Sequence, residues 1–140
     1  MLDFLGSYAA WGPTIIRLGA CITLIMHGHP KLFGAQPGPK GFAGYLKGMG
    51  IPNPMLMAYV VAIAEFVGGG CLLIGLFTRL AALVLAIEFV VIILKVKWDK
   101  GFLQTNGGWE WDWALLAMML SLLLTGPGHL ALDNRIHTGL

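Results

Sequence analysis

The sequence predicts an all-α membrane protein, a bundle of four transmembrane helices with a long Gly/Pro-rich loop between helices 1 and 2. Of the 140 residues, 57% are hydrophobic and only 11% are charged, and the mean hydropathy is +0.77. A soluble domain normally carries about 25% charged residues. So few charges could not cover the surface of a soluble globule, and lipid is therefore expected to be the solvent for most of the chain.

Four apolar segments account for the predicted helices, at about residues 8–26, 55–77, 78–97 and 111–125. A helix that crosses a bilayer needs roughly 20 residues, so four spans use about 80. The rest suffices only for termini and loops. Residues 1–140 are therefore expected to form a single transmembrane domain.

Turn-forming residues bound these segments. The first is predicted to end at the helix-breaking run from His27 to Pro30, and the run from Gly75 to Arg79 is predicted to form a tight turn. Irregular backbone cannot face lipid. The loop at residues 27–54 is therefore expected to lie in the headgroup layer or to fold back against protein.

The basic residues predict an orientation. Side A denotes the side that carries the termini, and side B the side that carries the loops at residues 27–54 and 98–110. Side B has Lys31, Lys40, Lys47, Lys95, Lys97 and Lys100, whereas side A has Arg79 and Arg135. The positive-inside rule places side B in the cytoplasm and both termini outside.

Composition also bears on partners. The net charge is +2 and no run of basic residues occurs, so nucleic acid is not an expected partner. The lipid bilayer is the first expected partner. A bundle this small leaves much of each helix facing outward, so other membrane protein subunits or a homo-oligomer are expected beside it.

Three charges fall near the middle of the predicted helices: Arg17, Glu65 and Glu88. A charge facing lipid costs about 2.5–3.5 kcal/mol, so these groups are expected to point inward and to find one another. Arg17 can neutralise one carboxylate. The other is predicted to be protonated or to pair with a partner outside this chain. The three are interpreted as structural contacts, as a proton-handling or ligand-binding set, or as a contact to another subunit.

A second polar group is predicted at side B, where the ends of the first and fourth helices meet. Its members are His27, His29, Lys31, Glu110 and Asp112. Plain hydrogen bonding at the interface is favoured, followed by binding of a quinone head group, which needs donors beside aromatic walls. No metal site is predicted, because the two histidines have a loop spacing without the i,i+4 geometry of a helical ligand pair.

The two cysteines are interpreted as packing residues. The predicted helices place Cys21 and Cys71 on the order of 15 Å apart in depth, at about 1.5 Å per residue. That separation is beyond the reach of a disulfide.

Several runs of residues occur in a recognisable order: HGHPKLFG at 27–34, MGIP at 49–52, AEFVGG at 64–69, LFTRLAA at 76–82, GWE at 108–110 and GPG at 126–128. Together they resemble the DoxX family of small four-helix membrane proteins, from about Arg17 to Asp133. The order and spacing of the runs carry the resemblance more than any single motif.

The resemblance implies a bacterial or archaeal membrane and a link to quinone-dependent redox systems, since the family is named for a subunit associated with a terminal quinol oxidase and with thiosulfate:quinone oxidoreduction. The polar residues that it carries over are Arg17, His27, Lys31, Glu65 and Glu110. By contrast, Glu88 and Asp112 depart from the family pattern, which favours a specialised partner.

We therefore expect a DoxX-like membrane subunit of a quinone-linked respiratory or redox complex, with quinone as the candidate ligand. No catalytic residue and no intrinsic cofactor are assigned. Haem is not expected, because all four histidines lie at predicted helix ends or in loops. The alternatives are an accessory subunit that stabilises a larger complex and a small transporter or channel that acts as an oligomer.

Overall fold

The computed structural model describes residues 3–35 and 38–137, and this part of the chain is helical and contains no strand. In chain order the elements are the 3-10 helix η1 (Asp3–Trp11), α1 (Gly12–Phe33), α2 (Gly38–Gly48), α3 (Pro54–Ile74), α4 (Thr78–Val91), the π-helix η2 (Ile92–Lys97), the short 3-10 helices η3 (Trp98–Lys100) and η4 (Gln104–Asn106), α5 (Glu110–Thr125) and α6 (Asp133–Ile136).

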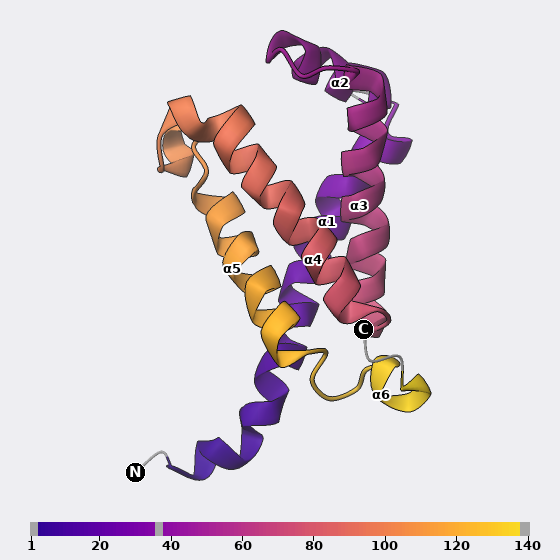
Figure 1. Cartoon of the computed structure of the whole chain (residues 1–140), viewed down its shortest axis with the longest axis vertical. Helices are drawn as coiled ribbons and strands as arrows, with labels where there is room; N and C mark the ends of the chain where they lie inside the picture. Colours follow the sequence, from indigo (N-terminus) through magenta and orange to yellow (C-terminus); the bar gives the residue numbers. More distant parts are fainter. Residues whose placement is uncertain (1–2, 36–37, 138–140) are drawn as a thin grey trace.

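The long helices associate in pairs. Helix α1 packs along α3, and α4 packs along α5, while contacts of α3 with α4 and of α1 with α5 join the two pairs. Helix α4 and its continuation η2 lean away from α3 toward the end of the molecule that carries α2 (Figure 1). That end is side B, and the α3–α4 turn lies at side A.

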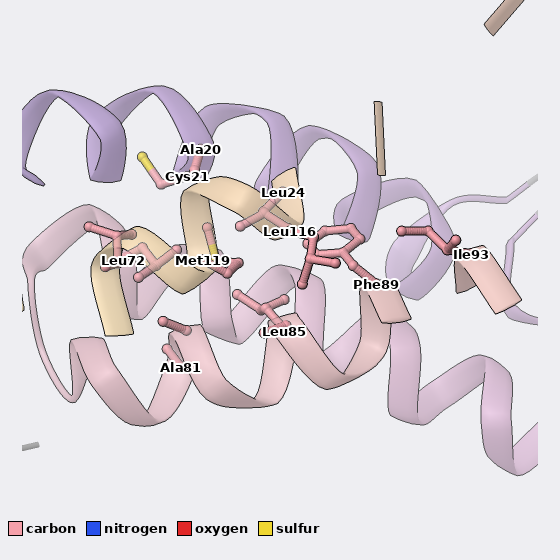
Figure 2. Packing of buried hydrophobic residues seen from close by; sticks show 13 residues of the cluster. Ala20, Cys21, Leu24, Leu72, Ala81, Leu85, Phe89, Ile93, Leu116 and Met119 are labelled. Atoms are coloured by element: carbon pink, nitrogen blue, oxygen red, sulfur yellow. The ribbon is translucent and has the colours of Figure 1, made fainter. Parts of the chain in front are cut away.

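Small residues let the helices of each pair approach closely. An added Cβ at Gly28 would lie 2.6 Å from the backbone nitrogen of Phe66, and one at Gly69 would lie 2.9 Å from Ile25 Cγ1. Glycine at these positions therefore permits the contact between α1 and α3. Larger side chains from α1, α3, α4 and α5 converge in the core (Figure 2), among them Leu24, Leu72, Leu85, Phe89 and Met119.

Two helices in the described part of the chain are long and apolar enough to cross a membrane, at Phe4–Phe33 and Pro54–Ile74. The all-helical fold is thereby confirmed. Helix α5 has 16 residues, or about 24 Å at 1.5 Å per residue, which is shorter than the roughly 30 Å hydrocarbon layer. That α4 with η2 and α5 also cross, as a four-helix bundle requires, stays a prediction.

The prediction that the first helix ends near Met26 is wrong. Helix α1 continues through Pro30 and ends at Phe33, where the Gly34 N–H donates to the Pro30 carbonyl at 3.0 Å. Proline lacks an N–H and removes one helical hydrogen bond. The close contact of Gly28 with α3, two residues earlier, holds the helix in place despite that loss.

The loop predicted at residues 27–54 contains helix α2, which the sequence analysis did not predict. Ala43 and Leu46 of α2 are buried against Ala58 of α3. Of the two expected placements, the segment therefore adopts the one in which it folds back against protein.

The chain after α5 returns to the turn between α3 and α4. The carboxylate of Asp133 accepts hydrogen bonds from the N–H groups of Phe77 and Thr78, at 2.7 and 2.8 Å. The Asp133 N–H in turn donates to the Gly75 carbonyl at 2.9 Å. A carboxylate at this place satisfies backbone donors at the start of α4.

Both cysteines are free thiols, but their predicted separation in depth is wrong. Because Gly69 lies against Leu24 and Ile25, Cys71 lies near the level of Cys21 along the α1–α3 pair. The two belong to one packing cluster, Cys21 as a buried member and Cys71 at its edge.

Candidate functional site

Arg17 lies near the side A end of the bundle, in the second turn of α1. Its guanidinium group donates four hydrogen bonds to backbone carbonyls, at 2.7 Å to Leu72, 3.0 Å to Leu73, 3.3 Å to His129 and 3.2 Å to Leu130. The expected pair of Arg17 with Glu65 or Glu88 therefore does not form. The reason is the register of α1 against α3, which places Gly28 beside Glu65 and Arg17 beside Leu72 and Gly75.

Glu65 pairs with Lys31 instead. The Lys31 ammonium group lies 2.6 Å from both carboxylate oxygens of Glu65. The Glu65 side chain is only 6% exposed and that of Lys31 is 21% exposed. The extension of α1 beyond Pro30 places Lys31 on the helix face that packs against α3, which a loop position would not do.

A second ion pair joins the other two helices. Lys97, the last residue of η2, donates to Asp112 Oδ2 of α5 at 2.6 Å. Asp112 is buried, whereas the neighbouring Lys95 is exposed. In the sequence Lys97 is only one of the side B charges, since position alone does not show whether Lys95 or Lys97 faces inward.

Both ion pairs line one cavity of about 510 Å³ at the side B end. This volume is within the range of about 300–1,000 Å³ typical of small-molecule sites. The aromatic part of the lining consists of Phe42, Tyr45, Phe89 and Trp111, and its further polar part of Thr23, His27 and Gln104. The cavity thus combines apolar walls with a few convergent polar groups.

Three residues of the predicted side B pocket line the cavity: His27, Lys31 and Asp112. The other two lie elsewhere. The His29 ring packs near the rings of Phe33 and Phe66, with centroids 5.4 and 6.0 Å away. Glu110 is bound by the Gln104 N–H at 3.0 Å and thus holds the loop before α5.

Glu88 differs from the other acidic residues in the helices. Both of its carboxylate oxygens are buried, and neither has a hydrogen-bond partner among the residues that the structure describes. It does not belong to the cavity lining. Of the three charges expected at mid-depth, only Glu65 therefore reaches the cavity.

The comparison with known families covers more than half of the chain. The DoxX family model matches residues 12–98, which include α1, α2, α3, α4 and η2. The chain belongs to the DoxX family. The resemblance inferred from the sequence motifs is thereby confirmed, and within the matched range lie Lys31, Glu65, Glu88 and Lys97.

Curated relatives of this DoxX chain are similar over most of its length. CatD of Bacillus subtilis (strain 168), whose name provisionally assigns it to the oxidoreductases, is 32% identical over 91% of this chain and 89% of its own. Rv3486 of Mycobacterium tuberculosis, named an uncharacterized membrane protein, is 33% identical over 86% and 78%. YphA of Escherichia coli (strain K12), named an inner membrane protein, is 29% identical over 86% and 87%. The chain is thus a membrane protein of the DoxX type. No solved structure matches it significantly.

Proposed function

We propose that this chain is a four-helix membrane subunit that binds a quinone-type head group in the cavity at side B, in the setting of a quinone-linked redox complex. The observation that carries the proposal is the 510 Å³ cavity that two lysine–carboxylate pairs and aromatic side chains line together.

The charges in the lining favour a neutral ligand. The positive charges of Lys31 and Lys97 are balanced by the negative charges of Glu65 and Asp112. An anion or a cation would have to displace one partner of a pair. A neutral ring would not, because each ammonium group has three N–H donors and can bond a ligand carbonyl while it keeps its carboxylate.

The walls favour a flat aromatic ligand. Phe42, Tyr45 and Trp111 line the cavity, and offset or edge contacts between rings are favourable by about 0.5–1.5 kcal/mol. The name of CatD places that relative among oxidoreductases, which supports a redox setting for a similar chain. A bound quinone or a partner protein would supply the redox chemistry.

The first test measures binding of 2,3-dimethyl-1,4-naphthoquinone to the full chain in lipid nanodiscs, by saturable quenching of tryptophan fluorescence. The double variant Lys31→Met/Glu65→Leu removes one polar anchor and both of its charges, which keeps a buried charge from being left unpaired. Since a hydrogen bond to a charged group contributes about 1.5–3 kcal/mol, we expect affinity to fall at least about tenfold.

The matched control is Lys40→Met, which removes an exposed lysine of α2 outside the cavity lining. It should bind like the wild type. Absence of saturable quenching in the wild type, or equal affinity in the double variant and the wild type, would contradict the proposal.

The buried oxygens of Glu88 favour a second candidate, an accessory subunit that packs against a larger membrane protein. This carboxylate has no hydrogen-bond partner within residues 3–35 and 38–137. A rotation of the half-buried Glu88 side chain toward the outer face of α4 would bring it to a cation of a partner subunit. The surrounding faces of α3 and α4 expose Ile63, Val84 and Ile87, which fits contact with lipid or with another helix.

Mass spectrometry of material purified from native membranes in mild detergent tests this candidate. Glu88→Gln should lose a stoichiometric protein partner and keep quinone binding, whereas Asp99→Asn, at an exposed acid, should lose neither. Recovery of the wild type with neither quinone nor a partner subunit would favour an oligomeric transporter or channel instead.

A further inference from the structure

The Lys97–Asp112 pair faces the same cavity as the Lys31–Glu65 pair but belongs to different helices. Lys31 and Glu65 join α1 to α3, whereas Lys97 and Asp112 join η2 to α5. Because one cavity touches both pairs, a ligand inside it lies between the two halves of the bundle.

We infer that the Lys97–Asp112 pair is the second polar anchor of the cavity, so that the ligand is a neutral ring with an oxygen function at each end. This inference rests on the proposed function and names the residues that bind the second oxygen of its ligand. A ring with a single carbonyl group would use only one of the two anchors.

The local backbone supports a binding role for Lys97. Element η2 is a π-helix of six residues, and π-helical turns are rare and occur frequently at functional sites. Ile92, Val96 and Lys97 of η2 line the cavity, whereas Lys95 is exposed. The irregular turn thus supplies both apolar wall and a cation to the same space.

Each pair can bond both redox forms of a quinone-type ring. A lysine N–H donates a hydrogen bond to the carbonyl oxygen of the oxidised form, and a carboxylate oxygen accepts a hydrogen bond from the hydroxyl group of the reduced form. Two such pairs offer one anchor for each oxygen of a 1,4-substituted ring. The site is therefore expected to bind the quinone and the quinol alike.

The test compares two uncharged bicyclic probes that carry the same two methyl groups, 2,3-dimethyl-1,4-naphthoquinone with two carbonyl groups and 2,3-dimethyl-1-tetralone (called 1-tetralone below) with one. Dissociation constants come from saturable tryptophan quenching in nanodiscs, with Trp111 in the cavity lining as a reporter. The variants are Lys97→Met/Asp112→Leu, which removes the second pair whole, and Lys95→Met, its exposed neighbour. A purely structural role would move both probes together.

We expect the wild type and Lys95→Met to bind the naphthoquinone at least about tenfold more tightly than 1-tetralone, since a hydrogen bond to a charged group contributes that much. The Lys97→Met/Asp112→Leu variant should lose this preference while its affinity for 1-tetralone stays unchanged. That pattern would support a second anchor.

Two results would overturn the inference and leave the proposed function intact. One is unchanged affinity for both probes in the Lys97→Met/Asp112→Leu variant, while Lys31→Met/Glu65→Leu still weakens binding. The other is an equal loss for both probes, which would mean that the pair only shapes the cavity. Absence of binding in the wild type would instead remove the proposed function, and this inference with it.

Discussion

At the scale of single residues, Glu65 and Arg17 satisfy their buried charges in two different ways. Lys31 and Glu65 neutralise each other across α1 and α3, whereas Arg17 spreads its charge over backbone carbonyls at side A. A guanidinium group suits the second solution because it presents five N–H donors in a fixed plane. The ammonium group of Lys31 suits the first, since it acts as a compact point charge.

The lysine–carboxylate pair gives a stability prediction. Glu65→Leu alone leaves Lys31 buried without its counter-ion and should lower the free energy of unfolding by about 3–5 kcal/mol. The double variant Lys31→Met/Glu65→Leu should recover most of that loss, because two apolar side chains replace the pair. Unfolding of detergent-solubilised protein by sodium dodecyl sulfate, followed by circular dichroism, measures both. Equal destabilisation of the single and double variants would argue against the pair.

Glycine packing gives a second prediction at this scale. A methyl group at residue 28 would approach the Phe66 nitrogen to 2.6 Å, and backbone cannot move aside as a side chain can. Gly28→Ala should therefore lower the free energy of unfolding by about 1–3 kcal/mol and loosen the contact that keeps Lys31 beside Glu65. Gly19→Ala is the matched control on the same helix, because a Cβ there meets nothing within 4 Å. The same unfolding assay would contradict the packing argument if both variants behaved alike.

At the scale of elements, most helix bounds were predictable because apolar runs end at Gly or Pro. The predicted range 78–97 corresponds to α4 with η2, and 111–125 to α5 within one residue. The end of α1 was not predictable. Proline usually ends a helix, but here the packing of Gly28 against α3 keeps the chain helical through Pro30. Helix α2 was missed for a similar reason, as its Gly-rich sequence becomes helical against α3.

The same limits apply to the candidate site. Sequence reasoning placed His27, Lys31 and Asp112 on one side of the membrane, and the structure brings them to one cavity. It could not pair Lys31 with Glu65, because that pairing depends on the three helical residues after Pro30. Nor could it choose Lys97 over Lys95, since the π-helical turn of η2 follows neither the period of an α-helix nor that of a strand.

Arg17 connects α1 to the end of α3 and to the segment after α5. Its replacement should therefore change the exposure of that segment. Arg17→Gln removes the hydrogen bonds that hold residues 129 and 130 against the end of α3, so the segment after α5 should detach more often. Limited trypsin digestion followed by mass spectrometry should show faster cleavage after the exposed Arg135. Lys95→Gln, at an exposed lysine of the opposite end, should leave the rate unchanged. An unchanged rate in Arg17→Gln would show that other contacts suffice.

At the scale of the whole molecule, the position of the cavity follows from how the two helix pairs are arranged. Helix α4 leans away from α3 toward side B (Figure 1), and the cavity with its two ion pairs lies at that end. At side A, Arg17 and Asp133 tie α1, α3, the start of α4 and the segment after α5 together. Hydrogen bonds thus join the elements at side A, whereas a cavity separates the two helix pairs at side B.

The orientation of sides A and B in the membrane can be tested by cysteine labelling. The basic residues predict that side B faces the cytoplasm and that residues near both termini face outward. Single cysteines at Lys40 and at Asn134, in a background with Cys21 and Cys71 replaced by alanine, should then differ in labelling. A membrane-impermeant maleimide added to intact cells should label the Asn134 site and should reach the Lys40 site only after the cells are opened. The reverse pattern would invert the topology.

The hydrogen bonds from Phe77 and Thr78 to Asp133 also bear on how the protein is made. These partners are 56 and 55 residues apart in the chain, so a ribosome releases the α3–α4 turn well before the carboxylate that completes it. Until Asp133 has been synthesised, the N–H groups of Phe77 and Thr78 can therefore donate hydrogen bonds only to other acceptors, such as water at the membrane surface. Assembly of side A is consequently completed late in biosynthesis, because a nascent chain stalled before Asp133 would lack the carboxylate that bonds the start of α4.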